Sequence, residues 1–140
     1  MKNRNLLLII PVLLFLMPAC NAQTTESNQA DETVSSETVE VYYFHFTRRC
    51  ATCQAVEDES EAALKDLYPE KVNAGEITFL SVNLEESENE PLAKKLNVSG
   101  QSLLLVKGEK QENLTNVAFM HARSNPEKLR DALKESIEKL

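Results

Sequence analysis

Apolar residues fall into two kinds of segment along most of the chain. Residues 39–46 and 103–106 are apolar almost throughout, which is typical of strands covered on both faces. Residues 77–84 give a further strand, and Gly108 follows the strand at 103–106 as a turn residue. Beyond that turn, a weaker edge strand is predicted near residues 111–116. The pattern therefore predicts four strands.

Other segments repeat apolar residues every three to four positions, as one face of a helix does. A helix is predicted over residues 50–68, ended by Pro69, and a short one over residues 89–96 with a proline in its first turn. A C-terminal helix is predicted to open at residues 124–127, where a capping box is combined with an early proline. The buried face of the first helix is predicted to carry Cys53, Val56, Ser60, Ala63, Leu64 and Leu67.

Two cysteines stand where the first strand meets the first helix, in the sequence Cys50-Ala-Thr-Cys53. Thiols three residues apart at a helix start can close a small disulfide, and the positive end of the helix favours the thiolate of the first. A C-x-x-C motif beside a β-α-β pattern is typical of thioredoxin-like redox proteins. The order β-α-β-α-β-β-α therefore predicts an α/β, thioredoxin-like fold over residues 39–140, with a central four-stranded mixed sheet flanked by helices.

The N-terminal segment has the layout of a bacterial lipoprotein signal peptide. A short basic start precedes an apolar run over residues 6–16, and a small residue precedes Cys20. We expect residues 1–19 to be a signal peptide, and residues 20–38 to be a lipidated cysteine followed by a flexible tether. An ordinary secretory cleavage after Ala22 is the alternative. The apolar run is shorter than the roughly 20 residues that span a bilayer. A lipid-anchored, periplasm-facing location in the bacterial cell envelope is predicted.

Cysteine count and charge exclude several classes of protein. The chain has only three cysteines, too few for a disulfide-stapled mini-protein or a four-cysteine zinc site. Its net charge is −7, and losing Lys2 and Arg4 with the signal peptide makes the exported form more acidic. An acidic protein is a poor partner for nucleic acid or anionic lipid. We therefore expect no nucleic-acid binding, and membrane attachment only through the lipid on Cys20.

Three segments resemble one family of bacterial thioredoxin-like proteins. They are residues 41–53, which include the cysteine pair, residues 99–108 and residues 114–123. The family is catalogued as the nitrophenyl compound nitroreductase subunit, or ArsF, family, and is associated with arsenic-resistance gene clusters. The resemblance implies a thioredoxin-like fold, a working cysteine pair, and a role in a reductive pathway for arsenicals or nitroaromatic compounds.

The chain departs from ordinary thioredoxins around the cysteines. Thioredoxins carry a buried aspartate at the position of Phe44; His45 is the nearest titratable substitute, although it is expected to point to the other side of the strand. They also place a cis-proline before the third strand, where this chain has Gly100-Gln101-Ser102. A cis bond without proline costs about 2.5–4 kcal/mol, so a trans peptide is expected. Without the proline ring, the thiols are expected to be more open to a metal or metalloid.

The candidate site residues follow from the motif and these departures. Cys50 is predicted to be the nucleophile, beside Arg48 and Arg49, whose charges favour the thiolate. Cys53 is predicted to resolve the intermediate from one turn further in, facing the sheet. His45 completes the predicted catalytic set, and the loop that lacks the proline is predicted to face the substrate.

Three functions remain open. The first is a thiol-disulfide oxidoreductase or electron-transfer subunit, served by a redox partner protein in the membrane or periplasm. The second is an arsenite-binding protein using Cys50 and Cys53, since sulfur ligands suit soft ions. The third is a lipoprotein with a purely structural disulfide. A zinc site that adds His45 and His121 is a further alternative, although neither histidine lies at zinc-finger spacing. We expect a monomer without a cofactor.

Overall fold

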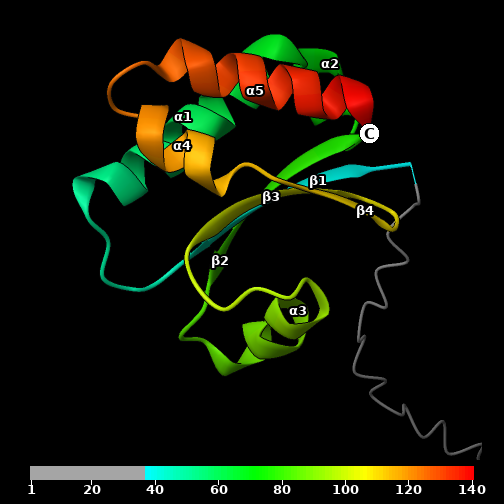
Figure 1. Ribbon diagram of the computed structural model, residues 1–140. Helices are drawn as coiled ribbons and strands as arrows, with labels where there is room; N and C mark the ends of the chain where they lie inside the picture. Colours follow the sequence, from blue (N-terminus) through cyan, green and yellow to red (C-terminus); the bar gives the residue numbers. More distant parts are fainter. Residues whose placement is uncertain (1–36) are drawn as a thin grey trace, which may run out of the picture. The chain divides into compact units, whose positions relative to one another are not determined.

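The computed structural model describes residues 37–140. The predicted signal peptide, Cys20 and nearly all of the tether lie outside these residues. No helix within residues 37–140 is long and apolar enough to cross a membrane. The elements, shown in Figure 1, are β1 (Val39–His45), α1 (Ala51–Leu67), α2 (Pro69–Asn73), β2 (Ile77–Asn83), the 3₁₀ turn Ser87–Asn89, α3 (Glu90–Lys95), β3 (Ser102–Lys107), β4 (Lys110–Asn113), α4 (Thr115–His121) and α5 (Pro126–Lys139).

The strands form one four-stranded mixed sheet in the order β2-β1-β3-β4. β1 runs parallel to β2 and antiparallel to β3, and β4 runs antiparallel to β3. A parallel pair needs a crossover, which α1 and α2 provide, whereas β3 and β4 need only a tight turn at Gly108, whose φ is 58°. A β-α-β unit followed by a β-β-α unit around one mixed sheet is the thioredoxin-like fold. The predicted fold class is therefore confirmed.

β1 lies inside the sheet and is buried on both faces. Successive strand residues point to opposite faces, so Tyr43 packs in one core with Val56, whereas Phe44 packs in a second core with Ala93. Figure 1 shows α1, α4 and α5 on one face of the sheet and α3 on the other. Because both of its faces are buried, β1 contains few polar residues. The predicted inner face of α1 is also confirmed, for Cys53, Val56, Ser60, Ala63 and Leu64.

The periodicity of the sequence does not predict two short helices, α2 and α4. α2 begins at Pro69, the residue predicted to end α1, because the missing N–H of proline is no loss at the first helical position.

The edge strand predicted to reach residue 116 is wrong beyond Asn113. The Leu103 N–H donates to the Thr115 hydroxyl at 3.1 Å, and the Thr115 N–H donates to the Asn113 side chain at 3.0 Å. These bonds turn the chain out of the sheet into α4.

The capping box predicted at the start of the last helix is not formed. Asn125 is the N-cap residue, without a side-chain capping bond, and Pro126 opens α5. The Ser124 hydroxyl donates instead to the carbonyl of Met120 at 3.0 Å, so it belongs to the end of α4. The predicted early proline is confirmed. The predicted cap is wrong, because the Ser124 hydroxyl is hydrogen-bonded to the end of α4 and not to the start of α5.

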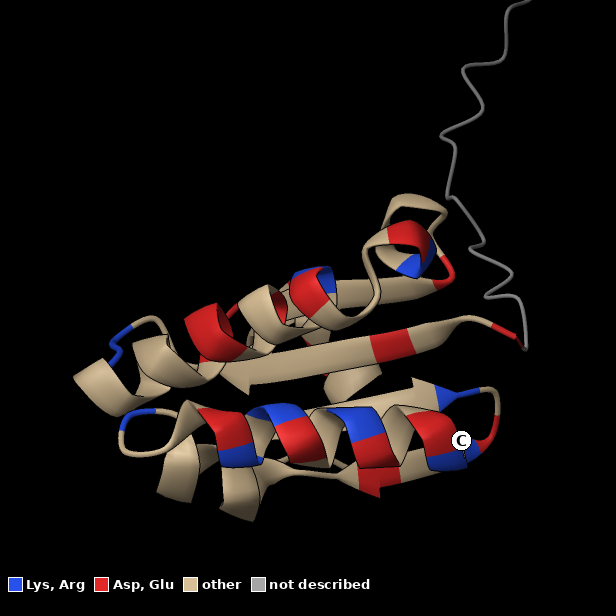
Figure 2. Ribbon diagram, turned by 90° about the horizontal axis from the view of Figure 1, so that it is seen from above, with Lys and Arg blue, Asp and Glu red and all other residues tan. Residues whose placement is uncertain are grey.

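Charged residues lie mainly on the outer faces of the helices. Figure 2 shows acidic and basic segments alternating along α5, while the strands carry few charges. Lys139 of α5 pairs with Glu112 of β4 at 2.7 Å, and Arg130 pairs with Asp66 of α1 at 3.1 Å. Such exposed pairs contribute about 0–1 kcal/mol each. The two apolar cores, rather than the ion pairs, hold the fold together.

Candidate functional site

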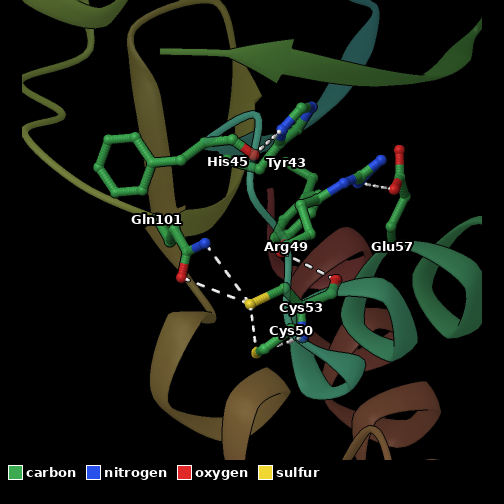
Figure 3. A network of polar contacts seen from close by, with 8 residues as sticks. Tyr43, His45, Arg49, Cys50, Cys53, Glu57 and Gln101 are labelled. Carbon is green, nitrogen blue, oxygen red and sulfur yellow. Dashed lines mark hydrogen bonds and ion pairs between the residues drawn. The ribbon is translucent and has the colours of Figure 1, made fainter. Parts of the chain in front are cut away.

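The cysteine pair occupies the first turn of α1 (Figure 3). Cys50 is the N-cap residue, with extended backbone angles (φ −89°, ψ 167°), and its sulfur accepts a hydrogen bond from the Cys53 backbone N–H at 3.3 Å. Cys50 is exposed, whereas Cys53 is only 3% exposed. Both are free thiols, with their Sγ atoms 2.6 Å apart. The pair is therefore placed for thiol exchange between one accessible and one sheltered sulfur.

The ionised form of the accessible thiol is stabilised by its neighbours. The hydrogen bond from the Cys53 thiol lowers the pKa of Cys50 below its ordinary value, and the Cys53 backbone N–H adds to this effect. Hydrogen bonds to a charged group favour its charged form. Because the thiolate is the nucleophile, this arrangement favours Cys50 as the sulfur that attacks first.

The two arginines predicted beside Cys50 have different surroundings. Arg49 is half-buried and forms an ion pair with Glu57, one turn along α1 from Cys53. Arg48 is exposed in the preceding loop. The charge of Arg49 is therefore partly neutralised by a carboxylate that the sequence analysis missed. The only signal for Glu57 was its spacing of four residues from Cys53, which puts both on one helix face.

His45 lies close to the site without contacting the sulfurs. Its Nδ1 lies 3.0 Å from the Phe46 carbonyl, within hydrogen-bond distance, and its ring is stacked beside Tyr43 with centroids 5.8 Å apart. Figure 3 shows the His45 ring away from both sulfurs. Phe44 belongs to the core on the α3 side. Neither residue therefore occupies the place beside Cys53 where a buried aspartate was sought.

Tyr43 provides the polar group that reaches Cys53 from the sheet. Its side chain is fully buried, and its hydroxyl donates to the Cys53 carbonyl at 2.9 Å. Burial raises the pKa of Tyr43 well above its ordinary value, and the Cys53 thiol raises it further, while Arg49 acts in the opposite sense. The sequence predicted Tyr43 only as part of the buried strand over residues 39–46. The alternation of strand residues, which sets Tyr43 on the face of α1, was the signal for its position.

The loop without proline places one polar side chain against Cys53. The Gln101 amide has its nitrogen 3.5 Å and its oxygen 3.6 Å from the Cys53 Sγ. Ser102 instead begins β3, is buried, and donates its hydroxyl to the Gly100 carbonyl at 2.8 Å. No peptide bond in the described part of the chain is cis, as expected for this loop. Of the three predicted loop residues, Gln101 is the one in contact with the thiols.

A second loop holds the segment that leads into the cysteines. The Thr47 N–H donates to the Glu85 carboxylate at 2.7 Å, and the Asn83 amide donates to the Thr47 hydroxyl at 3.0 Å. The Thr47 hydrogen bond lowers the pKa of Glu85. The connection between β2 and α3 therefore fixes the connection between β1 and α1, just ahead of Cys50.

A polar hollow of about 510 Å³ lies beside the Gln101 loop. Amide and hydroxyl side chains dominate its walls, and none of its lining residues is charged. It therefore suits a neutral group that donates and accepts hydrogen bonds. Gln101 borders both this hollow and the Cys53 sulfur. The polar lining is provided mainly by Asn97, Ser99, Gln101, Gln111, Asn113, Thr115 and Asn116.

The zinc alternative gains no support from the described part of the chain. There, no group of three or more His, Cys, Asp or Glu side chains is placed to hold a metal ion. His45 hydrogen-bonds elsewhere, and His121 lies at the end of α4. The two thiols remain as soft ligands that could hold an ion needing only two protein sulfurs.

Comparison with known proteins does not assign the chain to a family. No protein-family model matches the sequence. No curated protein is significantly similar to it. Among solved structures, a Fasciola hepatica thioredoxin is 23% identical, with 71% of this chain and 81% of that chain covered and a TM-score of 0.48. A structure described as a malarial protein is 24% identical, with 59% and 93% covered and a TM-score of 0.40. The fold assignment rests on the strand order above.

We predict that Cys50 is alkylated before Cys53 when the reduced protein is treated near neutral pH. Cys50 is exposed and its thiolate is stabilised by the Cys53 thiol, whereas Cys53 is buried. Peptide mass analysis of briefly alkylated protein gives the order of labelling. In Cys53→Ala the pKa of Cys50 should rise, because the donor is lost, and labelling at neutral pH should slow.

The matched variant for this experiment is Cys53→Ser, which keeps a hydrogen-bond donor of similar size. It should slow labelling of Cys50 less than Cys53→Ala does. Preferential labelling of Cys53 in the unmodified protein would contradict the assignment of the attacking sulfur.

Proposed function

We propose that this chain is an exported dithiol-disulfide redox protein working through Cys50 and Cys53. One observation carries the proposal: an exposed thiol with a lowered pKa lies 2.6 Å from a buried thiol at a helix start. Such a pair can reduce the disulfide of a partner by two electrons, and the pair is itself oxidised to the Cys50–Cys53 disulfide. The rest of the site shelters Cys53 and leaves Cys50 accessible.

The reaction takes place in two exchanges. The Cys50 thiolate attacks one sulfur of a partner disulfide, forms a mixed disulfide, and releases a partner thiolate that takes a proton from water. Cys53 then gives its proton to water, and its thiolate attacks the Cys50 sulfur. The Cys50–Cys53 disulfide forms, and the second partner thiolate leaves. The partner gains two electrons, and a reducing partner protein restores the dithiol by the reverse steps.

We further propose that this chemistry serves the cell envelope, in a reductive pathway for arsenicals or nitroaromatic compounds. The support is the resemblance of residues 41–53, 99–108 and 114–123 to the ArsF family, together with the signal-peptide layout that ends at Cys20. In this proposal the lipid on Cys20 attaches the domain to the membrane, and the redox partner is a membrane or periplasmic protein.

Arsenite binding is a second candidate function, favoured by the proximity of two free thiols. Arsenite binds sulfur through successive exchange of hydroxide for thiolate, releasing water when the thiols provide protons. Cys50 and Cys53 supply two such sulfurs, and Gln101 is the neutral side chain nearest the buried one. Soft thiolate ligands suit a soft metalloid ion.

We predict a reduction potential in the range of proteins that exchange disulfides, between about −270 and −120 mV. Stabilising the Cys50 thiolate stabilises the reduced form and raises the potential. Equilibration of the mature chain with thiol-disulfide buffers, followed by alkylation and mass analysis, measures it. Cys50→Ser and Cys53→Ser should each abolish the two-electron transition. A potential below about −300 mV would instead identify a structural disulfide.

We predict that Gln101→Pro weakens arsenite binding by the reduced protein about tenfold, near 1.4 kcal/mol. A proline ring beside Cys53 would crowd the third ligand of the ion. Ser102 is the poorer site for proline because it is buried in β3, opposite Phe44. Calorimetric titration with arsenite measures the affinity. Gln101→Ala removes the amide without adding a ring and should bind almost normally. Equal affinities for the two variants would remove the support for a metalloid site.

We predict a diacyl or triacyl addition on Cys20 in protein made by a bacterial host. Intact-mass analysis of the membrane fraction tests this, with Cys20→Ser as the unlipidated control. Cys20→Ser should shift the protein from the membrane fraction to the soluble one. An unmodified chain that begins at Gln23 would show ordinary secretion instead, in agreement with cleavage after Ala22.

A further inference from the structure

We propose that Tyr43 is the positioning residue for the second exchange: its hydroxyl holds Cys53 by the carbonyl beforehand and then turns its hydrogen to the thiolate that forms on the same residue. The proposal rests on the redox function above and adds a residue to it. In this proposal a neutral phenol takes the place of the buried carboxylate that was sought on this strand. The phenol stabilises the Cys53 thiolate by donating a hydrogen bond, and it does not accept the proton of the thiol.

The geometry of Tyr43 supports this role. Its side chain projects from β1 into the core under α1 and has no exposed surface. Its hydroxyl lies 2.9 Å from the Cys53 carbonyl, in the same residue whose sulfur must attack Cys50. Packing of the ring beside His45 limits its movement. A rotation about the phenolic C–O bond can redirect the hydrogen without moving the ring.

The electrostatic surroundings keep the hydroxyl a donor. Burial, and then the Cys53 thiol, raise the pKa of Tyr43, and Arg49 only partly offsets this increase. The phenol therefore stays protonated where the thiols react. Near Cys53 it can supply a hydrogen bond in a sheltered site, where hydrogen bonds to charged groups are stronger than those between neutral groups.

The other polar groups near Cys53 are less suited to this role. Glu57 is committed to Arg49 through an ion pair. His45 lies within hydrogen-bond distance of the Phe46 carbonyl. Gln101 approaches the sulfur from the opposite, loop side at 3.5 Å. Tyr43 is the side chain that joins the sheet to the first turn of α1, so its hydroxyl fixes the depth at which Cys53 is held.

The electron balance is that of the second exchange. In the mixed disulfide, Cys50 is bonded to the partner sulfur, and Cys53 is a thiol. Cys53 loses its proton to water, and the Tyr43 hydroxyl donates a hydrogen bond to the resulting thiolate. The thiolate attacks the Cys50 sulfur, the Cys50–Cys53 bond forms, and the partner thiolate leaves. Tyr43 is neither oxidised nor deprotonated.

A small aromatic disulfide that releases a coloured thiolate separates the two exchanges. Attack by Cys50 releases the first equivalent, and attack by Cys53 releases the second. In Tyr43→Phe we expect the first phase to be unchanged and the second to slow about tenfold, which corresponds to about 1.4 kcal/mol of barrier. Tyr68→Phe is the matched control, because the Tyr68 hydroxyl is buried and has no hydrogen-bond partner within residues 37–140. It should leave both phases unchanged.

The outcomes separate this inference from the proposed function. If the unmodified protein releases only one equivalent, the dithiol mechanism itself fails. If both phases are normal in Tyr43→Phe, or both slow equally, the dithiol mechanism stands and the positioning role of Tyr43 is overturned. Should Tyr43→Phe not fold, Tyr43→fluorotyrosine provides the test. Its more acidic phenol is a stronger donor and should accelerate the second phase alone; an unchanged second phase would overturn the proposal.

Discussion

The burial of β1 on both faces is the constraint on which the site depends. With β2 and β3 on either side and helices above and below, the end of this strand is fixed in the sheet, and the chain leaves it toward α1. Cys50 therefore lies at the start of a helix that is already anchored. Thr47 is held by Glu85, so the short connection between strand and helix is fixed at a second point.

The acidity of the accessible thiol is a property of the first helical turn. Its sulfur is stabilised by donors from Cys53, which is three residues away in the same turn. The neighbouring Arg49 has a carboxylate partner of its own in Glu57, which limits the field that reaches the sulfur. Because the donors are part of the helix start, the geometry that exposes Cys50 also stabilises its thiolate.

The sheltered thiol is surrounded by neutral groups. Tyr43 approaches Cys53 from the sheet and Gln101 approaches it from the loop before β3. Neither brings a charge, and both can donate hydrogen bonds. A buried thiolate without a charged partner is costly, and hydrogen bonds from these neutral groups offset part of that cost when Cys53 loses its proton.

The sequence by itself determined the α/β fold, the position of the cysteine pair and the inner face of α1, because these depend on local periodicity and on residues that neighbour one another in the chain. Only the tertiary structure decided that Tyr43, rather than Phe44 or His45, reaches Cys53. It also decided that Glu57 pairs with Arg49 and that Thr115 ends β4. These contacts join separate turns, strands and loops, and their distances depend on how the elements pack. A pattern along the chain indicates which face a residue occupies, but the partner that faces it is set by packing.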